Sequence, residues 1–243
     1  KSLYSKKEEI LQAIADPKTL KEVQKLTETN QDYYEIPPDD GLIKPYFDFD
    51  KELDHEPTHE EMIQEAKQVL KDFKKLGFNS RGTWAERHGK NAKGVHKISF
   101  RAWVPGYKTT KTELDKRIKM FKKANPDSSI DSGVYDERRR MGLINCKKGA
   151  TKVKSGYKDD QRILKWIDND EAYKFENTII SIVDESDNEW NFDEDEYQST
   201  EAEPPSPKSP MDDADDFIPE DHIELYEKLY PNPVFYGDNG TMF

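Results

Sequence analysis

The chain has 243 residues and a formal net charge of −12, and 36% of its residues are charged while only 33% are hydrophobic. This length suffices for one substantial domain with an appendage, and the low hydrophobic fraction predicts that part of the chain lies outside any core. The single cysteine, Cys146, excludes an internal disulfide and argues against a structural zinc site, so no zinc is expected and an intracellular location fits.

The negative charge is concentrated at one end of the chain. Residues 184–221 contain 16 acidic residues and one basic residue, and residues 222–243 carry a net charge of −2, which leaves +5 for residues 1–183. We therefore expect a mildly basic folded domain over residues 1–183, compatible with a polyanionic partner, with a helical N-terminal extension over 1–40. An acidic, largely irregular linker or tail over 184–221 and a short C-terminal segment over 222–243, with one docking helix, are expected to follow.

Helical and strand periods alternate along residues 1–183. No apolar run approaches the roughly 18 residues that span a bilayer, so no membrane partner is expected. The clearest helix covers residues 58–76, where Thr58 and Glu61 have capping-box spacing ahead of an apolar stripe. A strand, turn and second strand are predicted within residues 82–106. Further helices are predicted at 5–15, 19–26, 110–123, 161–167 and 173–183, and further strands at 130–135 and 141–146. This order predicts an α+β domain.

The segment KPYFDFD, residues 44–50, reads as a strand with two faces. Alternation places Tyr46, Asp48 and Asp50 on one face and Phe47 and Phe49 on the other, with the Cα atoms of the aspartates roughly 6 to 7 Å apart. Their carboxylates could then converge on one cation. The alternative is the solvated face of a half-buried strand without any ligand, which is common for such alternation.

A second segment, KGVHKISFR, opens another predicted strand. Gly94, two residues before His96, would allow a phosphate to approach the backbone while His96 and Lys93 donate hydrogen bonds. His96 also alternates in phase with Ile98 and Phe100, which is typical of a histidine packed in the core. Periodicity leaves both interpretations open.

A third segment, residues 128–149, combines one aspartate with many cations. Asp131 follows an isoleucine, and the basic residues after it are Arg138, Arg139, Arg140, Lys147 and Lys148. Such a set could complete a metal site and bind a triphosphate. Taken alone, a charged hairpin is the simpler interpretation.

In this order and spacing, the three segments resemble the archaeo-eukaryotic primase superfamily. Its pattern is a hydrophobic-Asp-hydrophobic-Asp strand, then small-x-His, then hydrophobic-Asp, matched by residues 47–50, Gly94-Val95-His96 and Ile130-Asp131. The continuation DSGVYDERRRM…KK is similar to the D-x-x-V-Y-x-x-N-R…K region of primase-polymerases and of the primase half of large-DNA-virus primase-helicases. The resemblance covers roughly residues 40–183 and leaves the acidic tail outside.

This resemblance implies an RRM-like catalytic sheet flanked by helices, and template-dependent nucleotidyl transfer that synthesises primers or extends DNA. It implies that Asp48, Asp50 and Asp131 hold two Mg²⁺ or Mn²⁺ ions and that His96 contacts the triphosphate of the incoming NTP or dNTP. Arg139 and Lys147 or Lys148 would bind phosphates.

The same resemblance suggests partners and a location for the protein, and the sequence departs from the family pattern at three positions. The partners would be a single-stranded DNA template, a helicase module and a single-strand-binding protein, in a nucleus or a viral replication compartment. Gly94 stands where serine is usual, Arg138 stands where asparagine is usual, and Gly142 stands where a further basic residue is common.

Two other classes of protein remain in view. A replication-initiator endonuclease of the His-hydrophobic-His type would need paired histidines on one strand, whereas His55 and His59 have helical spacing. A non-catalytic replication adaptor would use the acidic tail, in which residues 212–230 combine acids with aromatic and aliphatic side chains suited to a basic groove. A simple spacer to a helicase module is the plainer interpretation of that tail.

Overall fold

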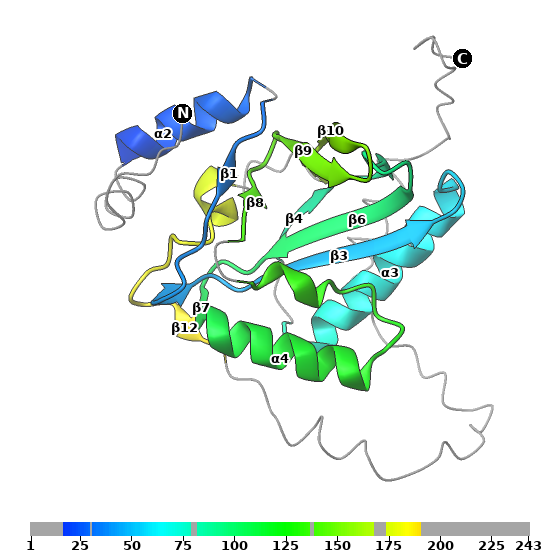
Figure 1. The fold of residues 1–243 in the computed structure, drawn as a ribbon. Coiled ribbons are helices and arrows are strands. Elements are labelled where there is room, and N and C mark those ends of the chain that lie inside the picture. The colour runs from blue at the N-terminus through cyan, green and yellow to red at the C-terminus, as the bar shows by residue number, and fades with distance from the viewer. Residues whose placement is uncertain (1–16, 30, 79–81, 137–138, 168–173, 191–243) are drawn as a thin grey trace, which may run out of the picture.

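The computed structural model describes residues 17–29, 31–78, 82–136, 139–167 and 174–190. They form a mixed α+β fold around an antiparallel sheet with the strand order β11-β4-β6-β3 (Figure 1). The short strand β5 also pairs with β6. The strands are β3 (Tyr46–Leu53), β4 (Thr83–Glu86), β5 (Gly89–Lys90), β6 (His96–Trp103) and β11 (Lys165–Trp166).

The free edge of β3 is covered by residues 129–131. The Asp50 amide donates to the Ser129 carbonyl at 2.8 Å, the Asp131 amide donates to the Asp48 carbonyl at 2.7 Å, and Phe49 bridges Ile130 in antiparallel register. With helix α3 (His59–Lys75) after β3 and helix α4 (Lys111–Ala124) after β6, the chain follows the order β-α-β-β-α-β. The spatial order is then β4, β6, β3 and the 129–131 segment.

Alternation along β3 divides this sheet into two faces, as its sequence predicts. Phe47 and Phe49 are almost fully buried, whereas Asp48 and Asp50 are partly exposed. On the buried face the Phe47 ring lies 6.0 Å from that of Phe73 in α3 and meets the Trp190 ring edge-to-face at 5.8 Å. Burial of aromatic rings of this size dominates core energetics, and it fixes the register that turns the carboxylates outward.

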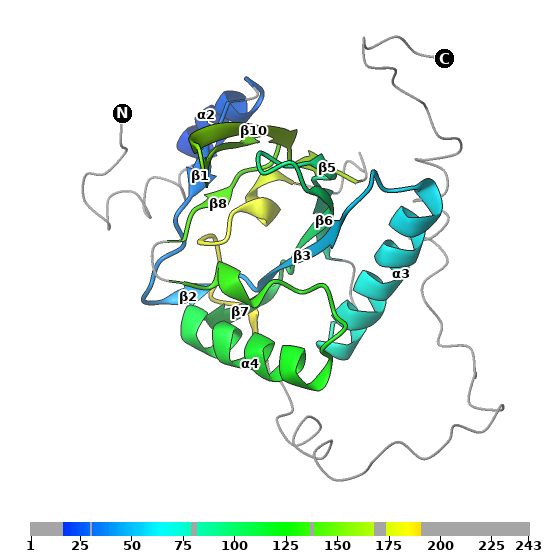
Figure 2. The ribbon, with the colours of Figure 1, turned by 45° about the vertical axis from the view of Figure 1, so that its right-hand side comes forward.

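Helix α3 lies on the aromatic face, and α4 runs alongside the β3 edge of the sheet, where it meets α3 and Trp190 (Figure 1). Lys75 of α3 donates to the Asn125 side chain at the end of α4 at 2.9 Å, and Arg117 of α4 lies over the ring of Trp190. Figure 2 shows β3 and β6 between α3 on one flank and β8 and β10 on the other. Among the described residues, no long helix covers the face that carries the aspartates.

Helices α3 and α4 begin as their sequences predict. The Thr58 side chain accepts from the Glu61 amide at 3.2 Å, and the Glu61 carboxylate accepts from the Thr58 amide at 2.8 Å. This capping box satisfies amides that a helix leaves unpaired. At the start of α4 the Thr110 side chain likewise accepts from the Glu113 amide at 3.2 Å. Helix α2 (Pro17–Thr27) confirms the helix predicted at 19–26, and the helix predicted at 5–15 lies outside the described residues.

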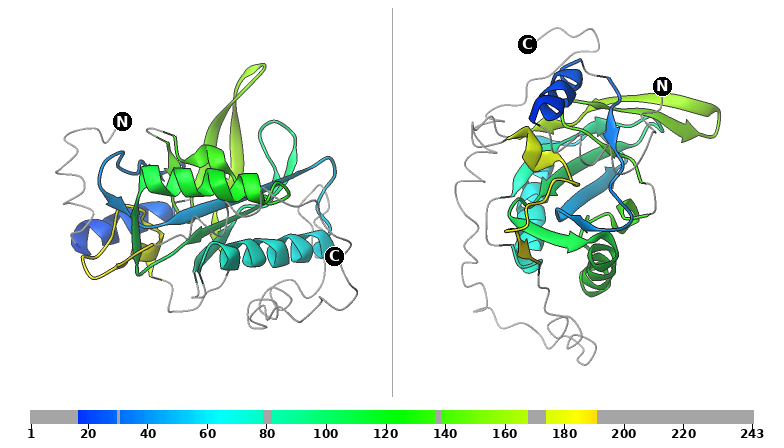
Figure 3. Two further views of the ribbon diagram at one scale, coloured as in Figure 1. Left: turned by 90° about the horizontal axis from the view of Figure 1, so that it is seen from below. Right: turned by 90° about the vertical axis from the view of Figure 1, so that its left-hand side faces the viewer.

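Smaller sheets complete the fold. β2 (Leu42–Ile43), β7 (Tyr107–Thr110) and β12 (Asn188–Glu189) form one of them, and β1 (Tyr34–Glu35) pairs with β8 (Met141–Gly142). The hairpin of β9 (Lys147–Val153) and β10 (Gly156–Ile163) projects from the side of the main sheet opposite α3 (Figure 3). In the part of the chain that is described, no helix combines the length and the apolar character that crossing a membrane requires.

The helices predicted at 161–167 and 173–183 are wrong. Residues 161–163 end β10 and residues 165–166 form β11, and the described part of the second segment holds only the 3₁₀ helix η2 (Phe175–Thr178). Side chains from distant segments provide the hydrogen bonds that a helix makes internally. The buried Glu35 carboxylate accepts from the amides of Ile180 and Ser181, and Lys44 donates to three carbonyls of residues 176–179.

The strands predicted at 130–135 and 141–146 are found only in part. Ile130 makes a single bridge to β3, after which the chain turns into the 3₁₀ helix η1 (Ser132–Val134). The Asp131 side chain causes this turn because it accepts from the Gly133 amide at 2.8 Å, a local bond that competes with strand pairing. In the second segment only Met141–Gly142 forms a strand.

The predicted domain end at residue 183 is too early. Residues 184–190 belong to the fold, because β12 pairs with β7 and Trp190 is 3% exposed in the aromatic core. The Trp190 indole donates to the Leu76 carbonyl at 3.1 Å. The remainder of the predicted tail, residues 191–243, lies outside the described residues.

Candidate active site

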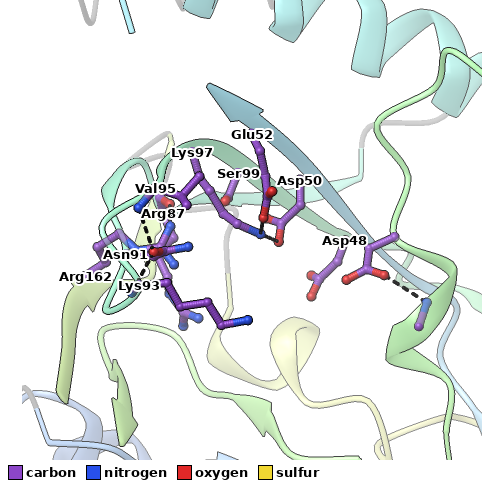
Figure 4. Close-up of polar contacts among 12 residues, drawn as sticks. Asp48, Asp50, Glu52, Arg87, Asn91, Lys93, Val95, Lys97, Ser99 and Arg162 are labelled. Carbon is purple, nitrogen blue, oxygen red and sulfur yellow. Dashed lines mark hydrogen bonds and ion pairs between the residues drawn. The ribbon is translucent and has the colours of Figure 1, made fainter. Parts of the chain in front are cut away.

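The aspartates of β3 face a row of polar side chains on β6. Antiparallel register sets Asp48 opposite Arg101 and Asp50 opposite Ser99, and Glu52 opposite Lys97. All of these positions share the face that lacks long helices. Figure 4 shows Asp48, Asp50, Lys97 and Ser99 on this face.

Asp131 joins the pair through the backbone. The Phe49–Ile130 bridge sets Asp131 directly opposite Asp48 across the edge of β3. Side chains directly opposite in an antiparallel ladder have Cβ atoms about 4.5 to 5.5 Å apart. Asp50 and Asp131 also line a common cavity of about 500 Å³ at this edge, together with Lys97, Lys122 and Ser129. The structure thus brings Asp48, Asp50 and Asp131 together.

The two carboxylates of β3 are neutralised by protein cations. Arg101 donates to Asp48 through Nε at 2.5 Å and Nη2 at 2.8 Å, and its Nη1 donates to the Gly142 carbonyl at 2.7 Å. The Nζ atom of Lys97 lies 2.9 Å from Asp50 Oδ2. Arg101 is 6% exposed, so its bidentate pair with Asp48 is largely shielded from solvent.

The pKa of Asp50 reflects this environment. Burial raises the pKa of this carboxyl, but the Ser99 hydrogen bond and the Lys97 charge outweigh burial and leave it below its ordinary value. The pKa of Lys97 is raised in turn: burial lowers it, and attraction to Asp50 more than compensates. Both shifts favour the ionised pair.

Three aspartates fit Mg²⁺ or Mn²⁺ in the chemistry of their oxygen ligands and in the adjoining backbone positions that carry them. Their side chains are not arranged around a shared centre: within the described residues, no group of three or more His, Cys, Asp and Glu is placed to enclose a metal. The reason is visible in the ion pairs, because Asp48 and Asp50 are turned toward Arg101 and Lys97. Metal binding requires these carboxylates to share or exchange their partners.

The Gly94-Val95-His96 segment does not take the position predicted for it. His96 pairs with Leu53 in register, which places it on the face of Phe49 and Ile98, opposite the aspartates. Gly94, with a φ of 85°, closes a tight turn between β5 and β6. The prediction that His96 lies beside the carboxylates is therefore wrong, because it lies two and four positions before the buried Ile98 and Phe100 and so shares their face of the strand.

The Lys93 side chain starts from the same turn but remains near the site. The turn is held by the Asn91 side chain, which accepts from the amides of Lys93 at 2.9 Å and Val95 at 3.1 Å. Figure 4 shows Lys93 reaching into the open space on the aspartate side of the sheet. Lys93 is thus placed to contact an anion there.

The predicted phosphate-binding cations are placed differently from one another. The Lys148 residue as a whole is exposed to solvent. Its ammonium group nevertheless lies near four charged side chains, those of Asp50, Arg87, Arg162 and Lys97. Desolvation and the neighbouring cations lower the pKa of Lys148 despite the attraction of Asp50. Lys147 precedes it in β9 and points to the other face of that strand, and Arg139 is exposed on the turn after η1.

Several site residues were missed in the sequence. Lys97, Ser99 and Arg101 alternate with the buried Ile98, Phe100 and Ala102 and directly face the aspartates. The period-2 pattern of β6 carried this signal. Arg87 and the pair of Arg162 with Asp160 were also missed, because they reach the site from β4 and from a hairpin that the sequence pattern did not reveal.

A scan against models of known protein families finds no match, and a search of curated proteins finds none either.

The Asp50–Lys97 pair predicts a loss of stability in acid. Because the folded pKa of Asp50 is depressed, its contribution is present above the ordinary value of 3.8 and disappears as the pH falls through the lower folded value. We expect Asp50→Asn to reduce the free energy of unfolding near neutral pH, and the difference from the wild type to shrink below about pH 4.

Urea unfolding with a chelator present, at several pH values, measures this difference. Glu22→Gln, at an exposed position of α2, is the control and should show a small, pH-independent effect. A difference for Asp50→Asn that stays constant into acid would contradict the prediction.

Proposed function

We propose that the chain is a template-dependent nucleotidyltransferase, a DNA primase or primase-polymerase of the archaeo-eukaryotic primase type. The observation that carries this proposal is that the backbone brings Asp48, Asp50 and Asp131 to adjoining positions at the edge of one sheet face. The basic residues Lys97 and Arg101 face them from β6. Its substrates would be an NTP or dNTP and a single-stranded DNA template.

The topology supports an RRM-like catalytic sheet. The β-α-β-β-α-β order, with β3 and β6 as the central strands, is the arrangement of ferredoxin-like and RRM-like folds. Helix α3 covers the aromatic face and α4 lies at the β3 edge, which leaves the aspartate face open for ligands. We propose that this sheet is the catalytic sheet of an archaeo-eukaryotic primase.

The second family motif has a better spatial match than the one expected from the sequence. Ser99-Phe100-Arg101 has the spacing of small-x-His, with arginine in place of histidine, and both outer residues face the aspartates. Ser99 supplies the small hydroxyl residue that Gly94 lacks. We therefore propose Ser99 and Arg101, in place of Gly94 and His96, as the motif residues of this site.

The residues of the chain have distinct roles in the proposed reaction. Ser99 and Lys97 orient Asp50, Arg101 orients Asp48, and Asp131 is fixed by its backbone bond to β3. Two Mg²⁺ or Mn²⁺ ions held by these acids would supply activation of a 3′-hydroxyl and neutralisation of the leaving pyrophosphate. Lys93, which extends on the aspartate side, and Lys148, whose ammonium lies near Asp50, are the residues proposed to bind the phosphates.

The direct test is nucleotide incorporation by the full chain on a single-stranded template with Mg²⁺ or Mn²⁺. Primed and unprimed templates separate extension from priming, and parallel reactions with NTPs and dNTPs define the substrate. Product that depends on both template and divalent ion is the expected result. No incorporation under any of these conditions would remove the proposal.

The structure gives the initiator-endonuclease alternative no support. His55 is held by Asp54 and Glu61 at the start of α3, and His59 is the first residue of that helix, so the two histidines do not share a strand. The adaptor alternative rests on residues 212–230, which lie outside the described residues.

The β9–β10 hairpin is the proposed contact for the template. Its tip carries Tyr157, which is 74% exposed, between the exposed Lys154 and Lys158. A single-stranded nucleic acid is bound by such a combination, because the ring stacks on a base while the lysines contact phosphates. The hairpin projects on the aspartate side of the sheet (Figure 3), so a strand bound there can reach the site.

We expect Tyr157→Ala to weaken binding of a single-stranded oligonucleotide about 10-fold, the loss of one stacked base. Fluorescence anisotropy at fixed salt measures the dissociation constant. Leu42→Ala removes a side chain that is 44% exposed on β2 and serves as the control. Equal affinities of Tyr157→Ala and the wild type would exclude the hairpin as a stacking contact.

A further inference from the structure

Arg87 is a buried cation without a full set of partners. The residue follows β4, is 8% exposed, and its amide donates to the Ser99 carbonyl at 2.9 Å. Its side-chain Nε and Nη2 atoms are buried and find no hydrogen-bond partner among the residues that the structure describes. Buried guanidinium donors are normally paired, so two unpaired ones indicate a ligand.

Among the residues described, the positive charge of Arg87 is not neutralised by a carboxylate partner of its own. Asp48 and Asp160 near Arg87, and Asp50 near Lys148, are each already engaged: Asp48 by Arg101, Asp160 by Arg162, and Asp50 by Lys97. Burial, followed by the charge of Arg101, lowers the pKa of Arg87 to about 10, so the group remains cationic at neutral pH. Within the described residues, Arg87 and Lys148 form no ion pair with a carboxylate. A multiply charged anion is the ligand that this imbalance fits.

Gly142 provides the space that Arg87 occupies. A Cβ atom at Gly142 would lie 2.9 Å from Arg87 Nη2, so the guanidinium fills the volume next to that glycine. Position 142 is where the resemblance leads one to expect a further basic residue. Arg87 thus brings a guanidinium from β4 to the place where the chain lacks a cation on β8.

We propose that Arg87, together with Lys148, is a receptor for the polyphosphate of the incoming nucleotide, and that it replaces the cation absent at Gly142. This proposal rests on the proposed function. Phosphates of a polynucleotide backbone share the same chemistry, but they carry one charge each, and a group that is 8% exposed is poorly reached by a continuous backbone. A terminal polyphosphate carries several charges and can insert end-on.

The test is calorimetric titration of the full chain with inorganic tripolyphosphate, with a nucleoside triphosphate and with a single-stranded oligonucleotide, in chelator. We expect Arg87→Met to weaken binding of both polyphosphates at least 10-fold and to leave oligonucleotide binding within about twofold. Lys165→Gln removes one exposed charge from β11, on the other face of the sheet, and should change neither.

A charge-relocation variant tests the replacement itself. Arg87→Ser combined with Gly142→Arg moves the guanidinium to β8, and Gly142 has no positive φ that would oppose a side chain. We expect this double variant to recover tripolyphosphate affinity to within about threefold of the wild type, whereas Arg87→Ser alone does not. If the double variant does not recover tripolyphosphate affinity, the proposal that Arg87 replaces a cation at position 142 is refuted.

Stability measurements separate a receptor from a structural arginine. Because two of its donors are unpaired, Arg87→Met should leave the melting temperature unchanged or raise it. A fall of several degrees in the melting temperature of Arg87→Met, or an unchanged affinity of this variant for polyphosphates, would refute the proposal that Arg87 is a polyphosphate receptor. If polyphosphate binding depends on Arg87 but no nucleotide is incorporated, Arg87 remains a polyphosphate receptor and the polymerase function is refuted. If nucleotide is incorporated but polyphosphate binding does not depend on Arg87, the polymerase function remains and the receptor role of Arg87 is refuted.

Discussion

Asp48→Ala is expected to reduce template-dependent nucleotide incorporation by on the order of 100-fold or more, because it removes the carboxylate at the position opposite Asp131 across the edge of β3. Initial rates with Mn²⁺ and with Mg²⁺, at saturating template, measure the effect. Asp54→Asn is the matched control: its carboxylate follows β3 and is 98% exposed, away from the Arg101 pair. Equal incorporation by Asp48→Ala and the wild type would end the catalytic assignment.

A loss of folding must be separated from a loss of chemistry in this experiment. Asp48→Ala leaves the buried Arg101 without its bidentate partner, and breaking such a pair costs about 3 to 5 kcal/mol. The double variant Asp48→Ala with Arg101→Leu removes both charges and should recover much of that stability. We expect it to melt closer to the wild type and still to be inactive, which places the defect in the chemistry.

The sequence predicted the frame of the site well where local patterns decide the structure. The FDFD alternation placed two aspartates on one face, and the Thr58–Glu61 capping box located the start of α3. These features depend on the two-residue period of a strand and on bonds between residues three apart, so no distant contact was needed to foresee them. The approach of Asp131 to β3 followed from the resemblance alone.

Long-range contacts explain the errors. Glu35 and Lys44 supply hydrogen bonds to residues 176–181 from more than 100 positions away, which abolishes a helix that local periodicity favours. The Trp190 indole completes an aromatic core from within an acidic run. His96 failed for another reason: two interpretations of one strand were open, and its in-phase relation to Ile98 favoured the core face that the structure shows.

Arg101→Ala is expected to destabilise the metal-free protein by about 3 kcal/mol and to make its stability strongly dependent on Mn²⁺. The variant leaves Asp48 unpaired beside Asp131, and a divalent cation can then take the place of the guanidinium. Melting temperatures with chelator and with millimolar Mn²⁺ measure this, and the rise on adding Mn²⁺ should be several degrees larger for Arg101→Ala than for the wild type.

Lys111→Ala provides the comparison for this experiment. It breaks an ion pair of another buried cation, with Lys111 Nζ 2.9 Å from the partly exposed Asp39, at the start of α4 and away from the three aspartates. This variant should lose stability, but Mn²⁺ should stabilise it no more than the wild type. If Mn²⁺ restored both variants equally, or neither, the competition between Arg101 and a metal for Asp48 would be refuted. A selective response of Arg101→Ala would show that the guanidinium occupies the position of a cation, independently of any measurement of nucleotide incorporation.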